Sequence, residues 1–180
     1  ADGRINTIVG DGIAGFSGQS GIAIDAMLNY PSSVTKTNNG DIIVSDYGNH
    51  KIRKVDRNGI ITRIAGIGVD GFGGDGGSAL NALIKNEGEV AVTDTGDVLF
   101  ADTWNNRIRK IFTNGTIVTI AGNGTGGYCG DGDLAINACV NYPVSVVVSN
   151  ASEVFISDEQ NHIVRKIDIH GIITTYAGTP

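Results

Sequence analysis

The chain has 180 residues, a formal net charge of −6 at pH 7 and 18% charged residues, and it contains 27 glycines but only 3 prolines. The acidic balance argues against binding to nucleic acid or to an anionic membrane, because both need a basic face. No stretch approaches the roughly 18 apolar residues of a membrane span, so we expect no membrane insertion. Scattered glycines among many valines and isoleucines favour short strands joined by tight turns.

One segment recurs three times along the chain without a slip in register. Its copies contain Asp46, Asp102 and Asp158, which are 56 residues apart, and each copy ends in an Ala-Gly pair. A fixed period of this length indicates a repeat architecture. The chain then divides into the last strand of a preceding unit and three repeats, which are residues 1–10, 11–66, 67–122 and 123–178.

The first ten residues resemble the end of a repeat whose beginning is missing. Ile5 and Ile8 lie 56 residues before Ile61 and Ile64. We therefore expect residues 4–9 to form a fourth strand that lacks the first three strands of its own unit.

A long glycine-rich connector opens each repeat. Its first half is expected to be irregular, with several glycines at positive φ. Its second half has apolar residues at i, i+3 and i+4, which predicts one short helical turn. The connectors are Asp11–Pro31, Ile67–Glu87 and Asn123–Pro143.

Four short strands follow each connector. They are rich in Val, Ile and Thr and are separated by turns such as Asn-Gly or Asp-x-Gly, a pattern typical of antiparallel hairpins. Apolar residues on both faces predict sheets that are covered on both sides. The predicted strands are Ser33–Thr37, Asp41–Ser45, Lys51–Asp56 and Ile60–Ala65 in the first repeat, Glu89–Thr93, Asp97–Ala101, Arg107–Phe112 and Thr116–Ala121 in the second, and Ser145–Ser149, Glu153–Ser157, Ile163–Asp168 and Ile172–Ala177 in the third.

Four antiparallel strands repeated radially make a β-propeller. The run from the second strand into the third resembles NHL-repeat proteins, and reads DYGNHKIRK at 46–54, DTWNNRIRK at 102–110 and DEQNHIVRK at 158–166. The resemblance implies an all-β fold: an NHL-type propeller segment of three four-stranded blades plus an extra N-terminal outer strand, as part of a larger propeller or assembly. It implies no single function, because the family includes scaffolds, receptors, nucleic-acid binders and occasional enzymes.

The most regular charges are one aspartate and one arginine in each repeat. A functional interpretation makes them a ring of ligand contacts. We favour a structural interpretation, in which each aspartate accepts hydrogen bonds from the turn between the second and third strands or from the arginine of its own repeat. These residues are Asp46, Asp102, Asp158, Arg53, Arg109 and Arg165.

Signals for phosphate binding, calcium binding or nucleophilic catalysis are weak. The sequence contains neither GxxxxGK[ST] nor G-x-S-x-G. Calcium at Asp70, Asp75, Asp131 and Asp133 is an alternative. Their spacing does not match an EF-hand, however, and Gln19 replaces Asp75 in the first repeat.

Zinc chemistry would need imidazoles that converge from several blades on the central channel. The histidines are His50, His162 and His170, and none lies on a predicted first strand, which we expect to line that channel. We therefore predict no catalytic, cofactor-binding or metal-binding residue and no enzymatic activity.

The two cysteines, Cys129 and Cys139, lie in the connector of the third repeat. We predict a disulfide, the alternative being two small buried thiols. Glycosylation sequons begin at Asn114, Asn123 and Asn150, all in predicted turns. Together these features favour an extracellular or secreted protein that carries N-linked glycan.

One exposed aromatic position has two interpretations. Trp104 and Gln160 lie two residues after the repeated aspartate, and Tyr47 lies one residue after it in the first repeat. The tryptophan is either a hot spot for a partner or a packing residue between blades, and the sequence does not separate the two.

The sequence favours a non-catalytic extracellular structural or binding protein that assembles through blades and strand pairing. Three blades cannot close a ring, since propellers need at least about four. We expect the partner to be another copy, in a homo-oligomer or a head-to-tail assembly, or a continuation of the same polypeptide, with other proteins as further candidates. The alternatives are an enzyme or small-ligand binder that uses the channel of a closed propeller, and a sensor ectodomain of a larger receptor.

Overall fold

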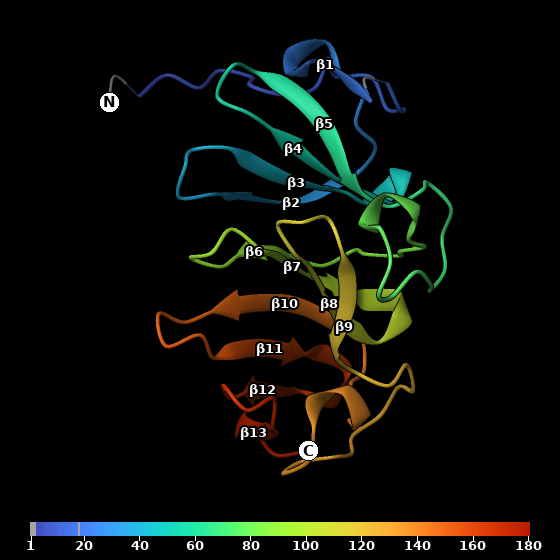
Figure 1. The fold of residues 1–180 in the computed structure, drawn as a ribbon, viewed down its shortest axis with the longest axis vertical. Coiled ribbons are helices and arrows are strands. Elements are labelled where there is room, and N and C mark those ends of the chain that lie inside the picture. Colours follow the sequence, from blue (N-terminus) through green and yellow to red (C-terminus); the bar gives the residue numbers. More distant parts are fainter. Residues whose placement is uncertain (1–2, 18) are drawn as a thin grey trace.

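The computed structural model describes residues 3–17 and 19–180, so Ala1 and Asp2 of the predicted strand segment 1–10 lie outside the described residues. Three antiparallel sheets lie side by side in sequence order, and we call them blades 1, 2 and 3 (Figure 1). The N-terminal segment leaves the stack at the blade 1 end, and the C-terminus lies at the blade 3 end.

Within each blade, the four main strands follow one another in sequence order and pair antiparallel. This up-and-down arrangement needs only short turns. Blade 1 contains β1 (Ser20–Ile22), β2 (Pro31–Lys36), β3 (Ile42–Asp46), β4 (Lys51–Val55) and β5 (Ile60–Ala65). Blade 2 contains β6 (Val90–Val92), β7 (Val98–Asp102), β8 (Arg107–Ile111) and β9 (Ile117–Ala121). Blade 3 contains β10 (Pro143–Val148), β11 (Val154–Asp158), β12 (Ile163–Ile167) and β13 (Ile173–Ala177).

The predicted strands of the three repeats are all present, with ends shifted by at most two residues. The helical turn expected in each connector is a short 3-10 turn, and a second 3-10 turn follows each second strand. The connector turns are η1 (Ala23–Asp25), η3 (Ala79–Asn81) and η5 (Ala135–Asn137), and the others are η2 (Tyr47–Asn49), η4 (Thr103–Asn105) and η6 (Glu159–Asn161). Among the described residues, no helix has the length and apolar character needed to cross a bilayer.

The predicted extra N-terminal strand is wrong. In the described chain, residues 4–9 belong to no strand, and Ile5 is 96% exposed, whereas its counterparts Ile61, Ile117 and Ile173 are buried. A fourth strand needs the third strand of its own blade for hydrogen bonding, and the described chain holds no such strand before residue 4. The fifth strand of blade 1 is instead β1, from the connector, which pairs with β5.

The hydrophobic core lies between the blades. Ile43 and Ile52 of blade 1 pack with Ala79, Ala82 and Ile84 of the following connector, and all five are at most 1% exposed. A second cluster repeats this arrangement between blades 2 and 3. Each connector therefore seals one blade against the next.

Candidate functional site

The repeated aspartate ends the second strand of each blade, and the repeated arginine lies on the third strand. All six side chains are fully buried. Within each pair, the distance from an arginine Nη1 to an aspartate Oδ2 is 3.3 Å for Asp46–Arg53, 3.4 Å for Asp102–Arg109 and 3.9 Å for Asp158–Arg165. A buried charge is tolerated only with a partner of opposite charge, so the aspartate and the arginine of each repeat make each other's burial possible.

Each aspartate also accepts hydrogen bonds from a backbone N–H group and from an asparagine side chain. In blade 2, Asp102 Oδ1 accepts the backbone N–H of Lys85 (2.7 Å) and the side-chain amide of Asn105 (2.8 Å). Asn105 also donates to the carbonyl of Gly71 in the connector (2.7 Å). Burial raises the pKa of Asp102. The hydrogen bonds of Asp102 therefore go to the connector, to the turn that follows its strand and to the arginine of its own repeat.

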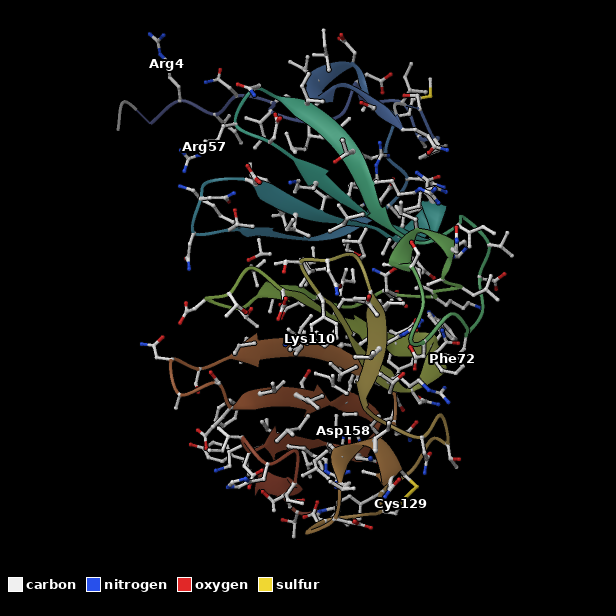
Figure 2. All side chains as sticks on the ribbon, viewed as in Figure 1. Arg4, Arg57, Phe72, Lys110, Cys129 and Asp158 are labelled. Atoms are coloured by element: carbon white, nitrogen blue, oxygen red, sulfur yellow. A yellow bond between two sulfur atoms is a disulfide. The ribbon has the colours of Figure 1, made fainter. Side chains whose placement is uncertain are left out.

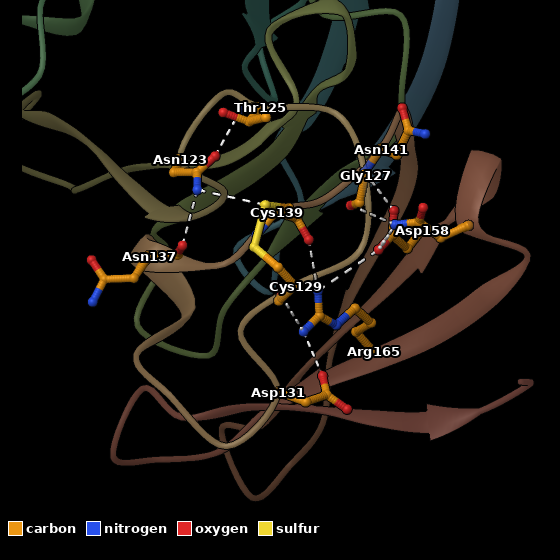
Figure 3. Close-up of a disulfide and its surroundings, with 11 residues drawn as sticks. Asn123, Thr125, Gly127, Cys129, Asp131, Asn137, Cys139, Asn141, Asp158 and Arg165 are labelled. Atoms are coloured by element: carbon orange, nitrogen blue, oxygen red, sulfur yellow. Dashed lines mark hydrogen bonds and ion pairs between the residues drawn. A yellow bond between two sulfur atoms is a disulfide. The ribbon is translucent and has the colours of Figure 1, made fainter. Parts of the chain in front are cut away.

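Each arginine also ties the connector to its blade. In blade 3, Arg165 donates to the carbonyls of Cys139 (2.8 Å) and Cys129 (3.1 Å) and to the carboxylate of Asp131, and the Nη1 that donates to Cys139 also faces Asp158 (Figure 3). Arg109 makes the same contacts in blade 2. The pair is therefore a clamp between the connector and the sheet.

Two aspartates considered for calcium belong to this clamp. Asp75 accepts from Arg109 (2.6 Å) and from the backbone N–H of Thr119 (3.1 Å). Asp131 accepts from Arg165 and from the N–H of Thr175 (2.7 Å). Burial acts to raise the pKa of Asp131, but these hydrogen bonds outweigh it and lower that pKa.

The other two calcium candidates are engaged elsewhere. Asp70 forms an ion pair with Lys85 (3.2 Å), and Asp133 accepts the backbone N–H of Leu134 (2.7 Å). In the part of the chain that the structure describes, no three His, Cys, Asp or Glu side chains converge on a point that would hold a metal ion.

Two of the three histidines end turns. His50 and His162 follow the 3-10 turns η2 and η6 in the left-handed conformation, with φ of 51° and 59°, and Asn106 takes this position in blade 2. Asn and His are among the residues that tolerate this conformation best. Burial lowers the pKa of His50. His170 lies in the exposed turn between β12 and β13.

Trp104 packs across the junction between blades 2 and 3. Its ring meets that of Tyr142 edge-on, with centroids 5.1 Å apart, and both side chains donate to Glu87. Burial and the hydrogen bond to Glu87 raise the pKa of Tyr142. These contacts make Trp104 a packing residue at this junction, although its side chain is still 49% exposed.

The cysteines form a disulfide, with Cα atoms 4.8 Å apart, on the connector of blade 3 (Figures 2 and 3). The three sequons lie in turns but differ in their hydrogen bonds. Asn114, Asn123 and Asn150 are all exposed. The amide nitrogen of Asn123 donates to the carbonyl of Asn137 (3.0 Å), beside the disulfide.

The two ends of the stack expose residues that are buried inside it. Val34 is 66% exposed, whereas its counterparts Val90 and Val146 are 5% and 1% exposed. A groove of about 900 Å³ lies at this end of blade 1, lined by Thr7, by residues 9–14 and by later residues of the first connector, including Tyr30. At the other end, Ala177 and Tyr176 are exposed.

Comparison with known proteins agrees with this architecture. A model of the family described as NHL repeat matches residues 28–55. Over 94 residues the sequence is 37% identical to NHL repeat-containing protein 2 of Gallus gallus, which covers 51% of this chain and 12% of that protein. The chain therefore contains an NHL repeat at residues 28–55. It is also 34% identical over 101 residues to Protein SUPPRESSOR OF QUENCHING 1, chloroplastic, of Arabidopsis thaliana, covering 55% of this chain and 9% of that protein.

Solved structures give the same fold for this NHL-repeat chain. A Bacteroides thetaiotaomicron protein of unknown function superposes with a TM-score of 0.63 and 19% identity, covering 82% of this chain and 35% of that one. A streptogramin B lyase superposes with a TM-score of 0.58 and 15% identity, covering 83% and 41%. At these identities the likeness shows the β-propeller fold alone. The chain spans less than half of each of these structures and about a tenth of its two curated relatives.

Sequence reasoning overlooked two sets of residues in the NHL repeats. Asn49, Asn105 and Asn161 join the repeated aspartate to the connector in every blade, and their recurrence was the available signal. Glu87 joins Trp104 and Tyr142 without any repeated counterpart, so no periodic signal pointed to it.

Proposed function

We propose that this NHL-repeat chain is a non-catalytic structural and binding segment whose two end faces associate with further propeller blades. The observation that carries the proposal is the exposure of Val34 at a position that is buried in blades 2 and 3. Moving an apolar side chain of this size out of water contributes about 1.5–3 kcal/mol. A further blade at this face provides that burial.

The use of the charged residues supports a non-catalytic role. The repeated aspartates and arginines are engaged with each other, with the turns and with the connectors, and the histidines are spread over separate turns. The hydrogen bonds of the aspartates and arginines hold the blades together. We therefore propose that the chain binds its partner through the complementary shape of its surface.

Light scattering of the 180-residue chain over a range of concentrations tests the assembly. We expect the average mass to rise with concentration and the Val34→Glu variant to stay monomeric. Ile136→Glu is the matched control, because Ile136 is 50% exposed and its counterparts Ile24 and Leu80 are exposed to a similar degree, so this position faces solvent in every repeat. A chain that stays monomeric at the highest concentrations, with or without residues 1–11, contradicts the proposal.

We also propose that the protein acts outside the cytosol and carries glycan on Asn114 and Asn150. The disulfide supports an oxidising compartment. Both side chains are exposed in turns, where an asparagine is accessible to modification. Intact-mass analysis of the chain expressed through a secretory pathway tests this. Loss of the extra mass in Asn114→Gln and Asn150→Gln is expected, and the mass of the bare polypeptide in the parent chain contradicts it.

A further inference from the structure

The apolar cluster at the outer face of blade 1 is incomplete when it is compared with the clusters between neighbouring blades. Between blades 1 and 2, the connector residues Ala79, Ala82 and Ile84 pack against Ile43 and Ile52 of the preceding blade. At the outer face, Ala23 and Ala26 are present with Leu28 and Val9 packed against them. The missing members are the apolar residues that a preceding blade supplies from its second and third strands.

The outer face of blade 3 offers these missing members. Phe155 is the counterpart of Ile43 and Leu99, and Val164 is the counterpart of Ile52 and Ile108. The four counterparts are at most 1% exposed, whereas Phe155 and Val164 are only partly buried. Tyr176 covers one edge of Phe155, with ring centroids 4.9 Å apart, and is itself 63% exposed. The two end faces are therefore complementary in the same way as the two sides of an internal junction.

A direct contact between these faces meets one obstacle, which is a duplicated strand. Residues 4–9 and 172–177 are the same part of the repeat. β13 fills the fourth-strand position beside β12, and its other edge is occupied by the connector, since Gly132 donates to Ile173 (2.8 Å) and Ile173 donates to Asp133 (3.0 Å). Residues 4–9 of a neighbouring molecule therefore have no free edge to join on blade 3.

The N-terminal segment already holds the place that the end of β13 would take. At the internal junctions, the glycine after the fourth strand donates to the first alanine of the connector turn, from Gly66 to Ala79 (3.0 Å) and from Gly122 to Ala135 (2.9 Å). At the outer face of blade 1, Gly10 makes this bond to Ala23 (3.0 Å). In a head-to-tail contact, the counterpart is Gly178 of the incoming molecule.

We propose that a second copy of the chain docks its blade 3 on blade 1, and that residues 3–11 are a plug that must leave for this contact to form. The proposal rests on the proposed function and adds the partner, the orientation and the competing segment. The plug is displaced rather than β13, because β13 is paired on both edges and residues 4–9 lie in no strand. Figure 1 shows the N-terminal segment running past blade 1 and away from the stack. Because the contact is head-to-tail, its repetition gives a ring or a filament.

Sedimentation velocity of the intact chain and of a chain lacking residues 1–11 tests the plug. We expect the truncated chain to associate with a dissociation constant at least tenfold lower. Val9→Asp in the intact chain is a second variant that weakens the hold of the plug without a deletion, and it should shift association in the same direction. Equal association of all three chains overturns the plug and leaves the proposed function standing, whereas no association in any of them overturns both.

A mixing experiment tests the orientation. In the truncated chain, Val34→Glu disables the blade 1 face and Tyr176→Glu disables the blade 3 face, and both positions are well exposed, so the fold tolerates the change. Each variant keeps one working face, so each alone should be monomeric while an equimolar mixture forms a dimer. Self-association of either variant, or a mixture that stays monomeric, overturns the head-to-tail contact.

Discussion

Blade 1 and blade 3 carry the same repeat but fasten the connector by different means. In blade 3, Asp131 links Arg165 to the backbone of Thr175, and the disulfide crosses the connector. In blade 1, Gln19 stands in place of Asp131, and the backbone N–H of Met27 donates to Ser17 Oγ (2.7 Å) where the disulfide would be. Both blades keep the buried pair of aspartate and arginine. The comparison teaches that the buried pair is the fixed part of the repeat and that the outer part of the connector is free to vary.

The largest effect should come from breaking the fixed part. Arg109→Ala leaves Asp102 buried without its cation and removes hydrogen bonds to Leu83 and Gly73, so we expect a loss of about 3–5 kcal/mol in the free energy of unfolding. Urea denaturation measures it. The control is Lys110→Ala, which breaks a partly exposed ion pair with Asp97 and should cost less than about 1 kcal/mol. Equal losses in both variants would show that the buried pair has no special weight.

Converting the blade 3 connector to the blade 1 version should have the next largest effect. The double variant Cys129→Ser, Cys139→Met reproduces the Ser17 and Met27 arrangement and removes the cross-link. Since the cross-link spans 10 residues, the chain-entropy model gives a loss of about 2–3 kcal/mol. Thermal unfolding of the variant, beside the parent chain with and without reductant, measures it. A variant as stable as the oxidised parent would mean that the hydrogen bond replaces the disulfide fully.

Supplying blade 1 with its missing carboxylate should have a smaller, stabilising effect. Gln19→Asp places an acceptor where Asp75 and Asp131 meet their arginines, so we expect a gain of about 1 kcal/mol for one charge-assisted hydrogen bond at a partly exposed site. Gln19→Asn is the control for side-chain length without the charge. Urea denaturation of both variants measures the change in the free energy of unfolding. An equal gain in stability with asparagine and with aspartate argues against a role for the charge.

The smallest effect concerns pH. The folded state lowers the pKa of Asp131 below its unfolded value, so its carboxylate stabilises the fold above the unfolded pKa, roughly 4, and this contribution is lost as the pH falls through the folded pKa. Asp131→Asn should therefore be less stable than the parent chain at pH 7, and the difference should shrink at pH 3. Denaturation at the two pH values measures it, with the exposed Asp25→Asn as control. A stability difference between Asp131→Asn and the parent chain that is larger at pH 3 than at pH 7 would contradict this prediction.

Much of the fold follows from local pattern in the sequence. The fixed 56-residue period placed the four main strands of each repeat within two residues, because alternating apolar runs and glycine turns act over short distances, but it gave no signal for β1 in the first connector. The same period indicated a structural role for Asp46 and Arg53 and their counterparts, since a buried charge must be paired wherever the repeat occurs.

Only the tertiary structure decided what depends on a neighbouring blade. Residues 4–9 have the sequence of a fourth strand but form none, because a strand needs a partner for its backbone hydrogen bonds. Val34 and Val90 occupy the same position in the repeat, yet one is exposed and the other buried, because burial is set by whether a blade lies against that face. Trp104 likewise became a packing residue only when the fold brought Tyr142 and Glu87 of other segments against it.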